Sequence, residues 1–165
     1  MTTLHRQLET RLGIDDAFAF IADFGNSMHW DPGTATSEPV GTGPAGLGSR
    51  YRLGVRMGSR LVPMEYRITD FEAPTRVVLT GSGSNVDAID EIRFSRAGTG
   101  THIDYTADIR LGGALRLVQP FLGRAFAKLA DDAVAGMQRA LDERADAAGT
   151  AQHGGASDAA GGVPA

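Results

Sequence analysis

The sequence predicts an α+β fold in which a curved antiparallel sheet of about seven strands wraps around one long C-terminal helix. Residues 34–111 form short runs of alternating apolar and polar side chains separated by glycine, which is typical of an antiparallel sheet with one solvated face. After Gly113 the apolar residues recur at helical spacing over residues 114–147. Two short helical patterns follow a first strand at residues 3–12.

The first helical pattern begins at a pair of acidic residues. Asp15 and Asp16 suit a helix start because carboxylates accept hydrogen bonds from the free amides of the first turn and favour its positive dipole end. The apolar run up to Phe24 then forms the buried face. Residues 26–30 predict a second helical turn, which the Asp-Pro-Gly sequence at 31–33 ends.

The C-terminal helix is expected to carry one continuous apolar face. Pro120 should kink this helix or begin a second segment, because proline lacks the amide hydrogen that a helix interior needs. The predicted domain spans residues 1–147. Residues 148–165 are rich in Gly and Ala, offer no apolar face, and predict a disordered tail. The expected apolar face consists of Leu115, Val118, Leu122, Phe126, Leu129, Ala133, Met137 and Leu141.

Composition excludes several classes of function. The 165 residues are 42% hydrophobic and include no cysteine, so one core is expected and disulfides and thiolate metal sites are excluded. A net charge of −4 argues against broad nucleic-acid binding. With no apolar run of membrane-spanning length and no signal-peptide pattern, we expect a cytoplasmic protein, and the abundance of Arg, Ala and Gly favours a bacterial source. Asp131, Asp132, Asp142 and Glu143 argue against an interfacial membrane helix.

Some familiar motifs do not indicate chemistry here. Residues 41–46 match the G-x-G-x-x-G string, but a strand rather than a helix follows, so a hairpin loop is predicted, and the glycines of 41–48 would also allow a gate. His5, His29, His102 and His153 lie far apart in sequence, so we predict no metal and no cofactor. An arginine stripe over residues 50–67 is interpreted as a solvated sheet face.

One inward carboxylate is the best candidate for chemistry. Asp90 shares its strand face with Val86 and Ile92, so strand alternation points it into the core. Tyr66 and Tyr105 point inward from their own strands. A carboxyl group in an apolar cavity has a raised pKa and can serve as a general acid or base, with the tyrosine hydroxyls orienting a carbonyl. The alternative is a structural hydrogen-bonding role for Asp90.

Asp90, Tyr66 and Tyr105 are therefore the candidate catalytic residues. The inward-facing side chains also predict a mostly apolar ligand-binding set. Its members supply buried area, and its methionines adapt to varied ligand shapes. The set consists of Trp30, Tyr51, Leu53, Val55, Met57, Met64, Tyr66, Ile68, Asp90, Ile92, Phe94, Tyr105, Leu122, Phe126 and Leu129.

Four features together carry a family resemblance. They are the run IDDAFAFIADF at residues 14–24, HWDPG at residues 29–33, the glycine-rich turn into an arginine-bearing strand at 41–50, and the long final helix. On these features the chain resembles the START-like (SRPBCC) superfamily, and most closely its polyketide cyclase/dehydrase branch, over about residues 3–144. The resemblance implies a helix-grip (START/Bet v1-like) fold enclosing a cavity for apolar ligands. It implies no catalytic residue, because the family has no universal catalytic motif.

Two functions remain open, with a weaker third. The preferred one is binding of a hydrophobic small molecule, such as a lipid, a fatty acyl chain or a polyketide-like compound, in a cavity between sheet and helix. The alternative is a polyketide cyclase or dehydratase in which Asp90 and a tyrosine move the proton. The third is an interaction module that holds a partner protein in its groove. Neither the ligand nor the oligomeric state follows from the sequence.

Overall fold

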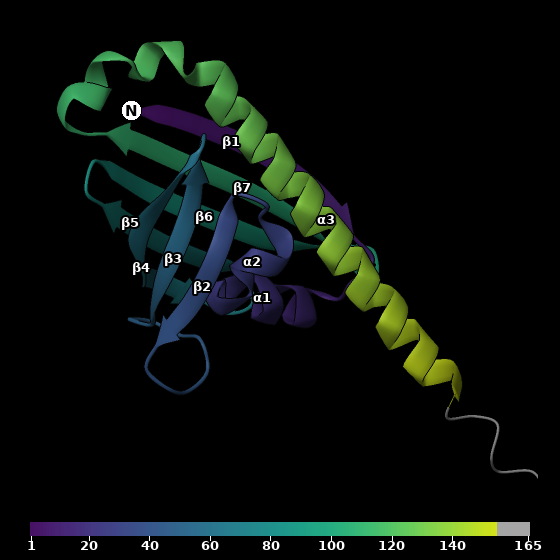
Figure 1. The fold of residues 1–165 in the computed structure, drawn as a ribbon. Coiled ribbons are helices and arrows are strands. Elements are labelled where there is room, and N and C mark those ends of the chain that lie inside the picture. Colours follow the sequence, from purple (N-terminus) through teal and green to yellow (C-terminus); the bar gives the residue numbers. More distant parts are fainter. Residues whose placement is uncertain (155–165) are drawn as a thin grey trace, which may run out of the picture.

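The computed structural model describes residues 1–154 of the chain and the side chains of residues 1–150 (Figure 1). One strand begins the chain, three short helical segments follow it, six more strands come next, and helical segments end the described chain. The elements in order are β1 (Thr2–Thr10), α1 (Ile14–Ala22), η1 (Phe24–Asn26), α2 (Ser27–Trp30), β2 (Thr34–Val40), β3 (Arg50–Met57), β4 (Arg60–Glu72), β5 (Arg76–Gly83), β6 (Val86–Ala97), β7 (Gly100–Leu111), η2 (Gly113–Leu117), η3 (Gln119–Phe121) and α3 (Gly123–Gly154).

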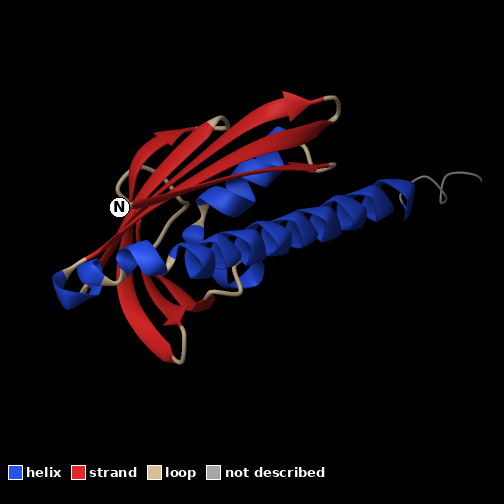
Figure 2. Ribbon diagram, turned by 90° about the horizontal axis from the view of Figure 1, so that it is seen from above, coloured by secondary structure: helices blue, strands red, loops and turns tan. Residues whose placement is uncertain are grey.

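The strands form one antiparallel seven-stranded sheet in the order β1-β7-β6-β5-β4-β3-β2. Register shifts lie between Thr34 and Thr36 on β2 and between Ile68 and Asp70 on β4. Such irregularities increase the local bend and twist of a sheet. The sheet accordingly curves around α3 (Figure 2). The predicted α+β helix-grip fold, with two short helices after the first strand, is confirmed.

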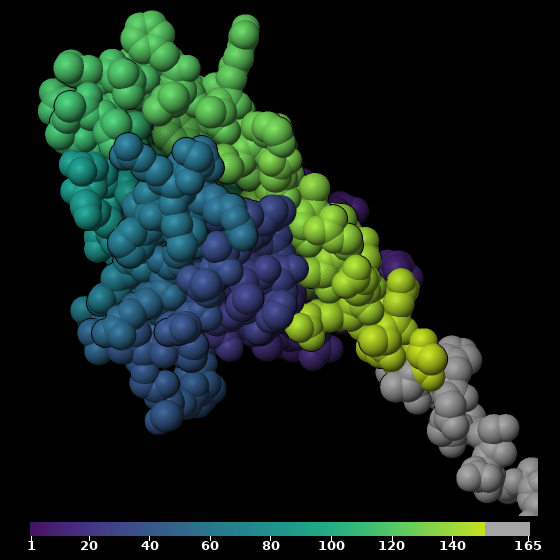
Figure 3. Space-filling model, viewed as in Figure 1, coloured from purple at the N-terminus to yellow at the C-terminus, as the bar shows by residue number. Residues whose placement is uncertain are grey.

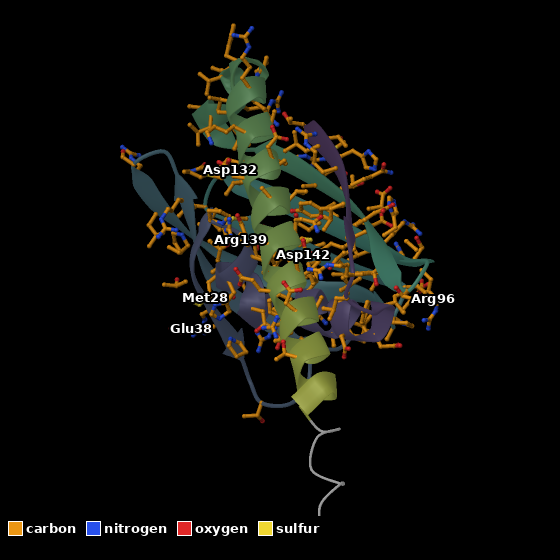
Figure 4. All side chains as sticks on the ribbon, turned by 90° about the vertical axis from the view of Figure 1, so that its right-hand side faces the viewer. Met28, Glu38, Arg96, Asp132, Arg139 and Asp142 are labelled. Atoms are coloured by element: carbon orange, nitrogen blue, oxygen red, sulfur yellow. The ribbon has the colours of Figure 1, made fainter. Side chains whose placement is uncertain are left out.

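Helix α3 closes the concave side of the sheet. Phe126, Ala130, Ala133, Met137 and Leu141 are buried and recur at intervals of three to four residues, so they form a single stripe along the helix. The stripe packs against β1 and α2, which bracket the helix. Outside it, Asp132, Arg139 and Asp142 project from the same helix (Figure 4).

The helix begins later than its apolar spacing predicts. Residues 113–121 form the short 3₁₀ segments η2 and η3, and the α-helix starts only at Gly123. Pro120 is the second residue of η3, where its missing amide is tolerated but a continuous α-helix is not. Leu115 and Val118, which were expected on the buried face, are therefore exposed.

At its other end α3 continues to Gly154, beyond the predicted domain end at residue 147. The first residues of the predicted disordered tail are thus helical, and residues 155–165 lie outside the described part of the chain. Among the residues described here, no helix is long and apolar enough to span a membrane.

Helix α1 fills one half of the concave sheet face. The Phe18 ring packs edge-on against Phe71 and Phe94, with ring centroids 5.2 Å apart in each pair. Phe24 of η1 packs edge-on against Trp30 with ring centroids 5.7 Å apart, and against Tyr66 in a tilted arrangement at 5.3 Å. This packing leaves open only the half of the face that lies under the N-terminal turns of α3.

Candidate ligand-binding cavity

A partly enclosed cavity of about 110 Å³ lies between the open half of the sheet and the first turns of α3. Most of its wall is apolar, and its polar groups come from a few residues. The partly or fully exposed residues of its lining, among them Leu4, Arg56, Met57 and Leu129, form its rim. Its lining consists of Leu4, Asp31, Gly33, Val55, Arg56, Met57, Met64, Tyr66, Val86, Ala88, Asp90, Tyr105, Ala107, Ile109, Phe126, Leu129 and Ala130.

Asp90 is the buried carboxyl group of this cavity. It is 5% exposed, and its Oδ1 accepts a 2.6 Å hydrogen bond from the Tyr105 hydroxyl. Within the described residues, no hydrogen bond of ordinary geometry reaches its other oxygen, Oδ2, although the Tyr66 hydroxyl lies close enough to help lower the pKa of Asp90. Burial raises the pKa of Asp90 to about 6, against the opposing effect of the Tyr105 hydrogen bond. Asp90 can therefore act as an acceptor or a donor for a ligand near neutral pH.

Asp31 is a second carboxyl group in the cavity wall, which the sequence pattern did not reveal. Its Oδ1 accepts from the Gly33 amide at 2.8 Å and its Oδ2 from the Thr34 hydroxyl at 2.8 Å. Burial raises the pKa of Asp31, and the charge of Asp31 helps to raise the pKa of Asp90. The only sequence signal was an Asp-Pro-Gly turn, which indicates a chain reversal as readily as a site.

Two tyrosines complete the polar wall. Tyr66 and Tyr105 are both buried, and burial followed by the charge of Asp90 raises the pKa of each hydroxyl well above its usual value. Both hydroxyls therefore stay protonated, and that of Tyr105 donates to Asp90. The Tyr66 ring lies directly over Gly81 on β5, where an added Cβ would come within 2.5 Å of it. Glycine at position 81 thus makes room for this ring.

The structure brings about half of the predicted ligand-binding set to the cavity. The members that line it are Val55, Met57, Met64, Tyr66, Asp90, Tyr105, Phe126 and Leu129. The members that do not line it are Trp30, Tyr51, Leu53, Ile68, Ile92, Phe94 and Leu122.

The five of these residues that lie on strands have a common explanation. Strand alternation correctly gives the direction of their side chains, but not which other side chains pack against them. Phe94 lies under Phe18 of α1, and Tyr51 and Trp30 lie beside Phe24, so helical side chains occupy that part of the concave face. These side chains belong to the packed core rather than to the cavity.

Arg56 lines the cavity although it was not among the predicted ligand-binding residues. It is exposed, as the solvated-face interpretation predicts, yet it contributes to the cavity rim. Its Nη1 donates to the Pro32 carbonyl at 2.9 Å. The backbone amide of Arg56 also donates to the Gly33 carbonyl, so β3 and the turn after α2 are held together at this rim.

The remaining motifs lie away from the cavity. Residues 41–49 form the loop between the paired strands β2 and β3, as the hairpin interpretation predicts. Gly41, Gly43 and Gly48 there have positive φ angles, which glycine adopts without strain. In the described part of the chain, no group of three or more His, Asp or Glu side chains is placed to hold a metal ion.

Comparison with known proteins identifies the family. Residues 1–142 match the family described as polyketide cyclase / dehydrase and lipid transport. The chain belongs to this family. The START-like resemblance read from the sequence is thereby confirmed, and membership supports binding of hydrophobic ligands in general. No curated protein matches the chain.

Solved structures support the same fold. A START superfamily protein from Mycobacterium smegmatis has a TM-score of 0.69 at 14% identity, covering 90% of this chain and 99% of the other. The protein TTHA0849 from Thermus thermophilus has a TM-score of 0.68 at 18% identity, covering 88% and 98%. Ara h 8.0201 has a TM-score of 0.60 at 15% identity, covering 84% and 97%. At these identities the likeness concerns the fold alone.

Proposed function

We propose that this family member binds a hydrophobic small molecule whose polar end meets Asp90 inside the cavity. The observation that carries the proposal is a buried carboxyl oxygen, Asp90 Oδ2, that forms no hydrogen bond of ordinary geometry and lies in a mostly apolar wall beside the Tyr66 hydroxyl. A buried polar atom without a partner is costly; a ligand hydroxyl would satisfy it by donating a hydrogen bond, and a ligand carbonyl would accept one from Asp90 in its protonated form. Tyr105 holds the carboxyl group from its other side.

The size of the cavity limits what enters it. Pockets that enclose a drug-sized ligand measure roughly 300–1,000 Å³, whereas this one holds about 110 Å³. It therefore accommodates a head group or a small ring system. A longer apolar chain would extend through the rim, where Leu4, Met57 and Leu129 supply apolar contacts.

A pair of small fluorescent probes tests this proposal. 2-Naphthol and naphthalene share a ring system, but only 2-naphthol can donate a hydrogen bond to Asp90 Oδ2. We expect the protein to prefer 2-naphthol in equilibrium titrations at neutral pH. Asp90→Asn should reduce that preference about ten-fold, because a charged acceptor is replaced by a neutral amide.

Two further variants make the test decisive. Asp87→Asn removes an exposed carboxylate from the same strand and should leave the preference unchanged. Ala107→Phe fills the cavity and should abolish binding of both probes. Binding that survives in a folded Ala107→Phe variant would place the ligand elsewhere and overturn the proposal.

The second carboxyl group favours an enzymatic alternative. With Asp90 ionised, its carboxylate could take a proton from a methylene group between two ketones. The resulting enolate carbon would attack a second carbonyl, and the oxygen of that carbonyl would take the proton back from Asp90. Asp31 supports this function because its charge helps to keep the pKa of Asp90 close to neutral.

Exchange of deuterium into a β-diketone measures the proton-transfer step alone. With benzoylacetone in deuterated buffer, we expect the protein to accelerate exchange at the methylene group, with a rate that rises as pH passes through about 6. Asp90→Asn should reduce the acceleration by about 100-fold or more. Equal exchange in both proteins would leave binding as the only supported function.

A further inference from the structure

A patch of exposed apolar side chains lies on the segment between β7 and α3. We define this turn patch as Leu115, Leu117, Val118 and Phe121, all of them exposed on η2 and η3 or between them. Phe121 is 85% exposed and Leu117 is 79% exposed. The segment forms the green cap of the molecule in Figure 3. A cluster of large apolar side chains on a protein surface marks an interaction site more often than single exposed apolar residues do.

The turn patch is held outward by a buried anchor. Between Val118 and Phe121, the Gln119 side chain is buried, and its Nε2 donates to the Ile109 carbonyl at 2.8 Å and to the Thr2 hydroxyl at 3.1 Å. Its Oε1 accepts from the Leu111 amide at 3.2 Å. The segment is therefore fixed to β1 and β7 through this polar side chain, while its apolar side chains face away from the core.

The charges on the segment that carries the turn patch have one sign. Residues 109–130 include Arg110, Arg116, Arg124 and Lys128 and no acidic residue. In the described residues Arg116 and Arg124 form no ion pair, whereas Lys128 pairs with Asp132 at 2.6 Å. Asp87 lies opposite Arg110 in the strand register. The other acidic residues of α3 begin at Asp131, and Figure 4 shows Asp132 and Asp142 farther along the helix than this segment.

The turn patch also borders the cavity rim. Ile109 before the segment and Phe126 and Leu129 after it all line the cavity. Leu129 is itself partly exposed. A surface that covers the turn patch would therefore lie next to the cavity opening.

We propose that the turn patch docks onto the surface of an anionic lipid bilayer. Phe121 and Leu117 would enter the boundary between head groups and acyl chains, while Arg116 and Arg124 contact lipid phosphates. A segment that combines exposed apolar side chains with unpaired cations fits this interface on both counts. A second copy of the chain fits it less well, because the two sets of cations would face each other. The docking does not depend on a ligand in the cavity.

Vesicle flotation tests the proposal. The full chain is mixed with phosphatidylcholine vesicles that either lack phosphatidylglycerol or contain about one-third of it. We expect binding to the anionic vesicles only, weakening as salt is raised, because salt screens surface charge. Leu117→Ser combined with Phe121→Ser should lower the partition coefficient by about ten-fold or more, and Arg116→Gln combined with Arg124→Gln by about ten-fold.

Matched variants at the far end of the sheet serve as controls. Leu47 is 72% exposed on the β2–β3 loop, and Arg52 and Arg67 are exposed on the outer sheet face, so Leu47→Ser and the pair Arg52→Gln and Arg67→Gln should bind vesicles like the wild type. Asp90→Asn should also bind normally, which separates this proposal from the cavity function.

Three outcomes would overturn the proposal. The first is that the protein does not bind anionic vesicles. The second is that the control variants lose as much vesicle binding as the turn-patch variants. The third is that vesicle binding is absent while the protein forms a concentration-dependent dimer, which the Leu117→Ser and Phe121→Ser changes abolish. The last result would assign the turn patch to contacts between copies of this chain.

Discussion

Replacing Asp90 by asparagine should change how the stability of this protein depends on pH. In the folded protein, burial raises the pKa of Asp90 from 3.8 to about 6. Between these pH values the folded state holds a proton that the unfolded state has lost. The contribution of Asp90 to stability is therefore greatest below about pH 4, falls as pH rises toward 6, and stays at its lower level above that.

The magnitude follows from the two pKa values. Each pH unit between them is worth ~1.4 kcal/mol, so ionisation of buried Asp90 costs the folded state about 3 kcal/mol at neutral pH. Asparagine keeps an acceptor for the Tyr105 hydroxyl and cannot ionise. The unfolding free energy of Asp90→Asn, minus that of the wild type, should therefore grow by about 3 kcal/mol between about pH 3 and pH 7.

Urea unfolding of both proteins at a series of pH values measures this difference. Comparing the variant with the wild type at each pH cancels the titration of the other carboxyl groups to first order. Asp87→Asn is the matched control, because it removes an exposed carboxylate from the same strand β6. A difference for Asp90→Asn that stays constant with pH, or that changes no more than in the control, would refute the buried-carboxyl argument.

Three other substitutions test the packing around the cavity. Tyr105→Phe removes the donor to Asp90 and should raise the pKa of that carboxyl group above about 6, measured as an upward shift in the pH at which stability titrates. Gly81→Ala places a Cβ against the Tyr66 ring and should lower the unfolding free energy by ~1–3 kcal/mol and weaken 2-naphthol binding, whereas Gly46→Ala, in open space, should not affect binding. Gly136→Ala should destabilise despite a ~1 kcal/mol gain in helix propensity, because its Cβ would clash with the Trp30 carbonyl oxygen. Gly123→Ala, where a Cβ meets no heavy atom within 4 Å, is the control, and thermal melts compare the two.

Local sequence rules account for most of the secondary structure. Period-two alternation identifies the strands from β3 to β7, and the same rule correctly directs Asp90, Tyr66 and Tyr105 inward, where all three are buried. The rule works because each strand pairs with neighbours in a regular ladder. It is less informative after Gly113, where apolar spacing predicts a helix and Pro120 and the buried Gln119 side chain impose 3₁₀ turns instead.

Which residues line the cavity depends on contacts between segments that are far apart in the sequence. Phe94 and Ile92 point inward as Asp90 does, yet Phe18 of α1 covers Phe94, and the cavity remains only where α3 passes over the sheet. No local sequence pattern predicts which helix covers which part of a sheet. Asp31 shows the same limit, since its turn is evident in the sequence but its approach to Asp90 is not.

The sequence by itself determined the α+β class, the strand faces and the inward carboxyl group, because these follow from side-chain periodicity over neighbouring residues. The family was indicated by the resemblance carried by residues 14–33, the glycine-rich turn at 41–50 and the long final helix, and the family match over residues 1–142 shows it. Only the tertiary structure decided which inward residues line the cavity, that a second carboxyl group joins Asp90, and that the turn patch faces outward. These features arise from packing between segments far apart in the chain, where the space left by one element depends on the side chains of another.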